Sequence, residues 1–188
     1  MTTRMQEKEK EVLMLINASN PYMENVMGDY LNEIECEVGR DTGQGMFRFS
    51  RTDLAAPTRR FYALAALRAA AAPRFAAGLH VEDLGETLYF KGAIVPVHFR
   101  GQGLMTALFD VVHRLEAKTH PQKKHKANVR VFPNGSANLA SLRALEKVGF
   151  QVCAVGDYEI QNNDADRHLA PSVEQNGRVR FLVLEAGN

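Results

Sequence analysis

Apolar and polar residues follow clear patterns over the second half of the chain. Short apolar runs bounded by turn residues predict strands, and apolar residues three or four positions apart predict helices that bury one face. These patterns predict strands at residues 74–84, 87–97, 127–132, 150–155 and 178–186, and helices at residues 103–120 and 138–149. Gly149 is predicted to end the second helix, since glycine adopts a left-handed conformation at little cost. Residues 121–126 are predicted to form a surface loop, and the polar stretch 162–177 separates the last two strands.

The first part of the chain gives weaker signals. Residues 5–35 predict one or two helices, interrupted near residues 17–22 by an Asn-Pro turn signal. Residues 46–50 alternate as a short strand does. Residues 56–72 are rich in alanine, and their larger apolar residues recur at helical spacing, so this segment predicts a helix closed by Pro73. Together the elements predict an α+β chain with most of its strands in the later part.

Composition narrows the class of protein. The chain has 188 residues, of which 45% are hydrophobic and 24% charged, which suits one domain over residues 1–188. The net charge of +1 gives no electrostatic reason to expect nucleic acid or an acidic membrane as a partner. No apolar run approaches the length of a membrane span, and the N-terminus lacks a signal-peptide pattern, so a soluble, cytoplasmic protein is expected. Cys36 and Cys153 follow no metal-ligand spacing, so no metal is expected, and both are predicted to be reduced, buried thiols.

The tripeptide Gly-Gln-Gly occurs twice, in different surroundings. Residues 101–103 lie where a predicted strand gives way to a predicted helix, whose first N–H groups have no partner within the helix. Glycine there lets the backbone approach an anion, and the helix dipole favours negative charge. Residues 43–45 precede a strand-like run instead, so they are predicted to form a simple turn. The later copy is neither a P-loop nor a dinucleotide fingerprint, because neither pattern is completed downstream.

Arg100-x-x-Gly103 resembles the pyrophosphate loop of the GCN5-related N-acetyltransferases, whose pattern is Gln/Arg-x-x-Gly-x-Gly/Ala. Residues 138–150 resemble the motif B helix of the same superfamily, in a form similar to its ribosomal-protein alanine N-acetyltransferase branch. The resemblance covers about residues 74–185, with both motifs in the expected order. It identifies residues 74–188 as the core with both motifs, and residues 1–73 as a divergent, helical N-terminal part.

The resemblance implies the acyl-CoA N-acyltransferase fold: a central mixed, largely antiparallel sheet, flanked by helices and splayed between its fourth and fifth strands. Those strands would be residues 87–97 and 127–132, with acetyl-CoA as cosubstrate between them. Main-chain groups of Val95 and Val97 would bind the pantetheine arm, since exposed strand edges need partners. The remaining cofactor-binding residues implied are Arg100, Gly101, Gln102, Gly103, Leu104, Met105, Thr106 and Asn138. Asn138 has an alternative role as the N-cap of its helix.

Two positions depart from the family pattern. Met105 stands where the pyrophosphate loop usually ends in a small residue, and its side chain would point into the helix packing or toward the cofactor. Leu145 occupies the position at which many relatives carry a tyrosine as general acid, and leucine cannot donate a proton. In the similar branch this tyrosine is commonly missing, and a serine in the helix is sometimes invoked near the sulfur. Ser141 lies at a comparable place and is a catalytic candidate, with simple packing as its alternative.

Acetylation of an amine requires an unprotonated amine and a general base within reach, with a pKa near neutrality. His80 and Glu82 alternate to one face of a predicted strand, so they form a plausible base and orienting partner, with Glu82 preferred. If that face meets solvent, they are ordinary surface polar groups. Further candidates are Asp83, Glu86 and His98 as bases, and Tyr89 and Tyr158 as acids.

The sequence therefore predicts an N-acetyltransferase that moves acetyl from acetyl-CoA to a primary amine. The acceptor partner would be a protein N-terminal or side-chain amine, or a small-molecule amine. One alternative is a non-catalytic acetyl-CoA-binding or sensing module, which Leu145 motivates, and another is a transferase for longer acyl chains, which Met105 motivates. A homodimer is left open as an assembly.

Overall fold

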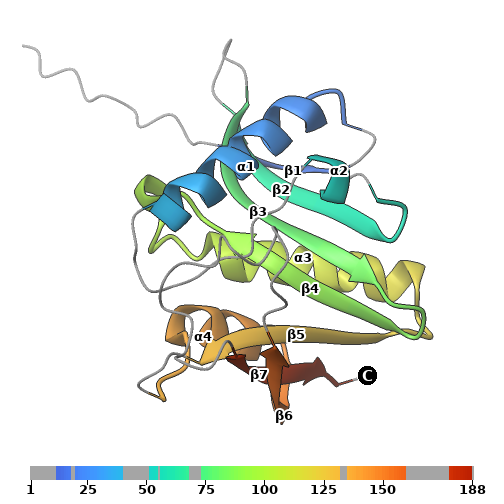
Figure 1. Cartoon of the computed structure of the whole chain (residues 1–188). Helices are drawn as coiled ribbons and strands as arrows, with labels where there is room; N and C mark the ends of the chain where they lie inside the picture. The colour runs from blue at the N-terminus through green and yellow to red at the C-terminus, as the bar shows by residue number, and fades with distance from the viewer. Residues whose placement is uncertain are drawn as a thin grey trace, which may run out of the picture.

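A seven-stranded sheet forms the centre of the computed structural model (Figure 1). The structure describes residues 12–17, 20–39, 51–54, 56–67, 73–131, 135–159 and 178–187. Its strands are β1 (Val12–Ile16), β2 (Arg59–Leu67), β3 (Arg74–Asp83), β4 (Thr87–Ile94), β5 (Lys124–Val131), β6 (Phe150–Glu159) and β7 (Arg178–Ala186). Its helices are α1 (Met23–Gly39), α2 (Arg51–Leu54), α3 (Leu104–Thr119) and α4 (Leu139–Lys147), with a short 3-10 helix, η1 (Val97–Phe99).

The strands lie in the order β1-β2-β3-β4-β5-β7-β6. Each neighbouring pair is antiparallel except β4 and β5, which run parallel and are joined by α3. A parallel pair needs a crossover connection, and a helix is the usual one. This mixed, largely antiparallel sheet with flanking helices confirms the α+β class predicted from the sequence.

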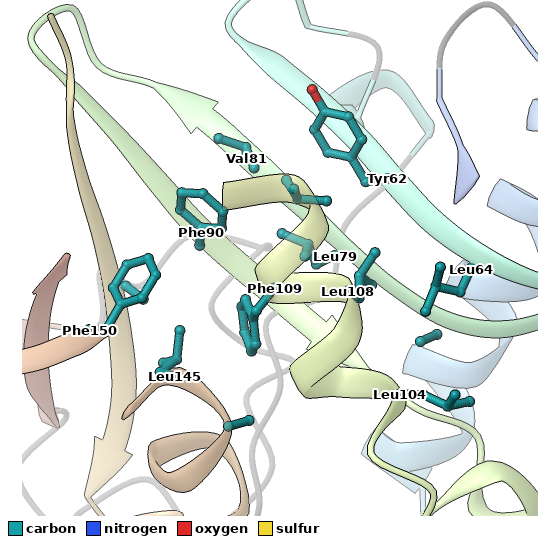
Figure 2. Packing of buried hydrophobic residues seen from close by; sticks show 14 of the residues in the cluster. Tyr62, Leu64, Leu79, Val81, Phe90, Leu104, Leu108, Phe109, Leu145 and Phe150 are labelled. Atoms are coloured by element: carbon teal, nitrogen blue, oxygen red, sulfur yellow. The ribbon is translucent and has the colours of Figure 1, made fainter. Parts of the chain in front are cut away.

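Two apolar layers hold the helices against opposite faces of the sheet. One layer, called the α3 layer below, joins α3 and α4 to the sheet. Figure 2 shows Leu108 and Phe109 of α3 and Leu145 of α4 within it. The other layer, called the α1 layer below, joins α1 and Leu54 of α2 to the opposite face, around the fully buried ring of Tyr30. None of the helices among the described residues is both long and apolar enough to cross a membrane.

The helix predicted at residues 56–72 is wrong: most of this segment is strand β2. Every residue from Phe61 to Ala66 is buried, because both faces of the strand are covered. Phe61, Ala63 and Ala65 face the α1 layer, whereas the residues between them face the α3 layer. Alanine favours helices in isolation, but tertiary packing overrides that preference where only small side chains fit between two layers.

The helix predicted over residues 5–35 is also wrong in part. Residues 12–16 form the edge strand β1, which pairs with Ala63–Leu67 of β2, and among the described residues of this range only the segment after the Asn-Pro turn is helical. A short apolar run cannot be assigned to helix or strand by periodicity alone. Here a pairing partner about fifty residues further along the chain decides the outcome.

Three further expectations need correction. Residues 124–126 begin β5 instead of ending a surface loop, and the imidazole of His125 is buried. Cys36 and Cys153 are both exposed free thiols, the latter on β6, which is the edge of the sheet formed by the described strands. The strand predicted to reach Val97 ends at Ile94. The predictions for residues 43–50 and 162–177 lie outside the described residues.

Candidate functional site

Strands β4 and β5 pair along only part of their length. The pairing runs from Thr87 with Lys124 to Phe90 with Ala127, although β4 continues to Ile94 and β5 to Val131. Figure 1 shows the two strands drawing apart beyond this point. Over the same stretch β5 remains paired with β7. In the described part of the chain, no strand therefore pairs with this stretch of β4 on its β5 side, which leaves backbone donors and acceptors for a ligand.

The chain after β4 turns sharply before α3 begins. Pro96 precedes η1, whose Phe99 is buried and anchors the turn to the core. Val97 lies in η1 and is 54% exposed, so it is not the strand residue that the sequence predicts. This turn forms because proline supplies no N–H to continue the strand ladder. The carbonyl of Val95 accepts a hydrogen bond of 3.0 Å from Nε of Arg100, which braces the turn.

The glycine turn lies at the beginning of α3. Gly101 and Gly103 have φ of 78° and 75°, a left-handed conformation that other residues rarely adopt. No heavy atom of the described residues lies within 4 Å of a Cβ added at either position, so the backbone there faces space that the described part of the chain leaves open. Gln102 is exposed between them. The predicted turn therefore exists, and glycine is required for its conformation.

Gly103 is the N-cap of α3, and within the described part of the chain no capping hydrogen bond from a side chain is found at this end of the helix. The first N–H groups of a helix have no acceptor within it, so those of residues 104–106 remain for an anion or water. Leu104 is buried, Thr106 is partly buried, and Met105 packs against the α3 core layer. Of the two orientations considered for Met105, the structure has the one that points into the helix packing.

Helix α4 begins on the other side of the divergence, after β5. Asn138 is its N-cap: its Oδ1 accepts a hydrogen bond of 3.3 Å from the backbone N–H of Ser141. The backbone N–H of Asn138 donates to the carbonyl of Arg130 at 2.9 Å, which ties the start of α4 to β5. The capping role considered for Asn138 is therefore present, while its contact with a cofactor stays a prediction. Ser141 is partly buried in the first turn of α4.

Leu145, at the position where many relatives carry an acidic tyrosine, faces the core. It is 1% exposed and belongs to the α3 layer together with Phe90 and Phe150 (Figure 2). Its side chain is therefore directed away from solvent, into the packing between α4 and the sheet.

His80 and Glu82 lie on one face of β3, as the sequence predicts. Their neighbours Leu79 and Val81 belong to the α3 layer, so His80 and Glu82 lie on the α1 face. His80 is 0% exposed, and its Nδ1 would lie 2.8 Å from a Cβ added to Gly92 of β4. This imidazole is thus buried beside the part of β4 that has left β5, and the predicted surface alternative does not apply to it.

Glu82 is held by two cations on neighbouring strands. Its carboxylate accepts from Nζ of Lys91 and, at 3.3 Å, from Nη2 of Arg59. Burial raises the pKa of Glu82, but the hydrogen bond and charge of Lys91 and the charge of Arg59 outweigh it and leave the pKa below its usual value. Glu82 is therefore ionised at neutral pH, with its acceptor sites largely engaged.

The other acid and base candidates lie in different surroundings. Hydrogen bonds from Lys123 at 2.5 Å hold the pKa of Asp83 below its usual value, at the end of the sheet where β4 and β5 are paired. Glu86 is exposed in the turn, and Nε2 of His98 lies 3.3 Å from Nη2 of Arg74. Tyr89 is partly buried, with Nζ of Lys91 5.5 Å from its ring centre. The side chain of Tyr158 lies outside the described part.

Sequence reasoning missed Tyr30 and Gly92. The hydroxyl of Tyr30 on α1 donates a hydrogen bond of 2.6 Å to the carbonyl of Gly92, whose φ is 57°. A glycine within a strand signals a bulge or a close backbone approach, so Gly92 could have been found from the sequence. Nothing local marks Tyr30, which is 62 positions away along the chain.

A pocket of about 480 Å³ lies elsewhere, at the start of β2. Its lining includes Met23 and Met27 of α1, Leu54 of α2, and Arg59 and Phe61 of β2. It therefore adjoins the end of the sheet where β4 and β5 are still paired, and it is separate from their divergence. Among the described residues, no group of three or more His, Cys, Asp or Glu side chains could hold a metal ion.

No protein-family model matches the sequence, and no curated protein matches it. Solved structures match the fold over nearly the whole chain. An acetyltransferase of the GNAT family from Streptococcus pneumoniae matches with a TM-score of 0.60 and 12% identity, covering 94% of this chain and 100% of that one. The ribosomal-protein-S18-alanine N-acetyltransferase from Escherichia coli matches with a TM-score of 0.58 and 13% identity, covering 93% of each chain. Spermidine N-acetyltransferase from Vibrio cholerae, solved with CoA and spermine, matches with a TM-score of 0.57 and 12% identity, covering 92% of this chain and 95% of that one. The chain therefore has the fold of the GCN5-related N-acetyltransferases, as the two sequence motifs predicted.

Proposed function

We propose that this protein is an acetyl-CoA-dependent N-acetyltransferase that transfers acetyl directly to a primary amine. The observation that carries the proposal is the end of β4–β5 pairing at Phe90 and Ala127, with both strands continuing beyond it. An exposed strand edge beside an uncapped helix N-terminus offers amide partners and an anion site side by side. The amides of pantetheine match the strand edge, and the pyrophosphate matches the helix N-terminus.

The cofactor would bind along β4 and the glycine turn. Main-chain groups of Val95 and Val97 would bind the pantetheine arm, and the backbone N–H groups of Gly101 to Thr106 would hold the pyrophosphate. Arg100 would add positive charge, and Asn138 would contact the arm from the other side of the divergence. The left-handed glycines at 101 and 103 support this proposal, because the space above them is open.

Direct transfer needs a base, an oxyanion site and an outlet for the thiolate. The amine nitrogen forms a bond to the thioester carbon, the amine's proton passes to a base, and the carbon–sulfur bond breaks so that CoA leaves as a thiolate. The thiolate then takes up a proton from the protonated base or from water, which gives the free thiol. Backbone N–H groups on the free edge of β4 would stabilise the oxyanion. The candidate catalytic side chains are His80, Glu82 and Ser141. Between the two bases the contacts favour His80, because Lys91 and Arg59 already engage Glu82.

The acceptor class is proposed from the proteins that share the fold. One is a ribosomal-protein alanine N-acetyltransferase, and another is a spermidine N-acetyltransferase. We therefore propose a protein N-terminal amine or a small aliphatic amine as the acceptor. An α-amine titrates near pH 8 and a lysine side chain near 10.4, so an α-amine needs less help to lose its proton.

Release of free thiol from acetyl-CoA tests the proposal. The purified protein is incubated with acetyl-CoA and, separately, a peptide with N-terminal alanine, a peptide with an internal lysine, and spermidine. Thiol release that depends on one of these amines, with the acetylated amine found by mass spectrometry, is expected. The same assay with Ser141→Ala tests whether Ser141 takes part, and unchanged turnover would remove it from the catalytic set.

A non-catalytic acetyl-CoA-binding module is the second candidate, and the burial of Leu145 favours it because no acid faces the thiolate from that position. Saturable binding of acetyl-CoA without thiol release for any amine would support this candidate over the enzyme. Propionyl-CoA and longer acyl-CoA donors in the same assay test the remaining alternative, a transferase for longer acyl chains.

A further inference from the structure

The side chain of Tyr30 lies in a slot formed by two glycines on neighbouring strands. A Cβ added to Gly78 of β3 would lie 2.6 Å from Cδ2 of Tyr30, and one added to Gly92 of β4 would lie 2.6 Å from its hydroxyl oxygen. The ring is fully buried and packs 4.8 Å from the ring centre of Phe61 and 6.0 Å from that of Phe75. Both ends of this tyrosine are therefore fixed against the sheet.

Gly92 is part of a bulge in β4. The register between β3 and β4 shifts by one residue between Lys91 and Ile94, so β4 carries one residue more than β3 over this stretch. The φ of 57° at Gly92 lies in the left-handed region that glycine favours. A bulge changes the direction in which the following backbone groups point.

Tyr30 fixes the orientation of the peptide unit between Gly92 and Ala93. Its hydroxyl donates to the Gly92 carbonyl at 2.6 Å, so this carbonyl points toward α1. The peptide is trans, as are all peptides in the described part of the chain. In a trans peptide the N–H points opposite to the carbonyl, so the N–H of Ala93 points away from α1.

The bulge lies where the proposed cofactor edge begins. Phe90 is the last residue of β4 that pairs with β5, and Gly92 follows two positions later. The side chain of Ala93 packs against the α3 layer, on the opposite side of the sheet from Tyr30. The Gly92–Ala93 peptide is thus on the free stretch of β4, and its orientation is set from the opposite face.

We propose that Tyr30 is a positioning residue for acyl transfer: through the Gly92 carbonyl it directs the N–H of Ala93 toward the thioester oxygen of the acyl donor. The proposal rests on the proposed function. Donors that are oriented before the reaction stabilise the developing oxyanion without reorganisation. The hydroxyl of Tyr30 supplies that orientation to the N–H of Ala93, although this buried hydroxyl does not itself touch the acyl donor.

Tyr30→Phe tests the proposal because it removes only the hydroxyl and keeps the ring in its slot. Tyr62→Phe is the matched control, since it removes another buried hydroxyl, which donates at 2.6 Å to Glu116 on the α3 face. Both variants are compared with wild type in thiol release from acetyl-CoA, using the amine that the wild type acetylates fastest, with kcat and KM measured separately. Near-UV circular dichroism confirms that each variant is folded.

Tyr30→Phe is expected to lower kcat about tenfold, which is less than the loss of about a hundredfold or more caused by removing an oxyanion donor outright. Its KM for acetyl-CoA should stay within about twofold of wild type, and the kcat of Tyr62→Phe should be unchanged. If Tyr30 had only a structural role, kcat would change to a similar extent in both variants. Unchanged kcat in Tyr30→Phe, or an equal loss in both variants, would overturn the assignment of Tyr30 while leaving the proposed function intact. Absence of wild-type turnover would overturn the proposed function and this inference together.

A second measurement on the unmodified protein does not depend on the folding of a variant. Amide NMR follows the N–H of Ala93 while acetyl-CoA or CoA is added. We expect acetyl-CoA to shift this resonance beyond the shift caused by CoA, whereas the N–H of Ala77 on β3 should respond equally to both. An Ala93 resonance that responds equally to both ligands would contradict the proposed contact with the thioester.

Discussion

Phe90 of β4 pairs with Ala127 of β5, and this is the last pair that joins the two strands. Both residues are buried in the α3 layer, where the ring of Phe90 packs 5.6 Å from that of Phe150 and 6.5 Å from that of Phe109. The divergence therefore begins directly after a firmly packed aromatic cluster.

Leu145→Tyr tests whether a general acid can be restored at the family's tyrosine position. Leu145 is fully buried, so a larger side chain would overpack the layer between α4 and the sheet. We expect a loss of about 1–3 kcal/mol in the free energy of unfolding and no gain in thiol release. Urea denaturation and the thiol assay measure the two quantities. Leu139→Tyr, at an exposed position of the same helix, should change stability by less than about 0.5 kcal/mol. Faster thiol release in Leu145→Tyr would show that this position does reach the leaving thiolate.

His113 of α3 and His125 of β5 lie with their Nδ1 atoms 2.7 Å apart, and His125 is buried whereas His113 is partly buried. Burial lowers the pKa of both, and the neighbouring His113 and His120 help to lower that of His125 to about 4. In the unfolded chain a histidine binds its proton near pH 6.5. Between pH 6.5 and 4 the unfolded state therefore holds more protons, so the free energy of unfolding should fall as the pH falls through this range.

We expect wild type to lose about 2 kcal/mol of unfolding free energy between pH 7 and 5 from His125, because each unit of pKa shift corresponds to about 1.4 kcal/mol. His125→Gln should flatten this dependence, and His98→Gln, at an exposed position, should leave it as in wild type. Urea denaturation at a series of pH values measures the free energy of unfolding at each pH. An equally steep loss in His125→Gln would mean that other groups cause the acid sensitivity.

His80→Gln and Glu82→Gln separate the two candidate bases. His80 is buried beside Gly92, whereas Lys91 and Arg59 hold Glu82 and its pKa lies below the usual value. A base with a low pKa takes a proton poorly, so we expect His80→Gln to lower kcat by about a hundredfold or more and Glu82→Gln by less than tenfold. The pH–rate profiles of the two variants are the measurement. A larger loss in Glu82→Gln would assign the base to Glu82 and make His80 a packing residue.

Most elements from residue 74 onward could be predicted, because apolar runs between turn residues mark the strands and apolar residues at helical spacing mark α3 and α4. Segments 12–16 and 59–67 could not, since the structure of both depends on pairing with each other, and that of 59–67 depends also on burial on both faces. Alanine gives no sign of which of two layers it will face. The local preference of residues 59–67 for helix is outweighed by packing interactions, and these exist only once the sheet has assembled.

The candidate site also has parts that the sequence predicts and parts that it does not. The conformations of Gly101, Gly103 and Asn138 are local requirements of a turn or a helix start, so the sequence predicts them. The slot around Tyr30 joins α1, β3 and β4, and its members are far apart in the chain. Within it, Gly78 and Gly92 carry a local signal, since each is a glycine inside a strand.

Calorimetric titration of acetyl-CoA into wild type and Gly103→Asp tests the central claim most directly. Gly103 and Gly85 have nearly equal φ, 75° and 79°, and open space at the Cβ position, so Gly85→Asp in the β3–β4 turn controls for backbone strain. We expect saturable binding of acetyl-CoA but not of ATP to wild type and to Gly85→Asp. In Gly103→Asp the carboxylate would repel the pyrophosphate, and affinity should fall at least a hundredfold. No binding to wild type, or equal losses in both variants, would contradict the proposal that the divergence of β4 and β5 and the glycine turn bind acetyl-CoA.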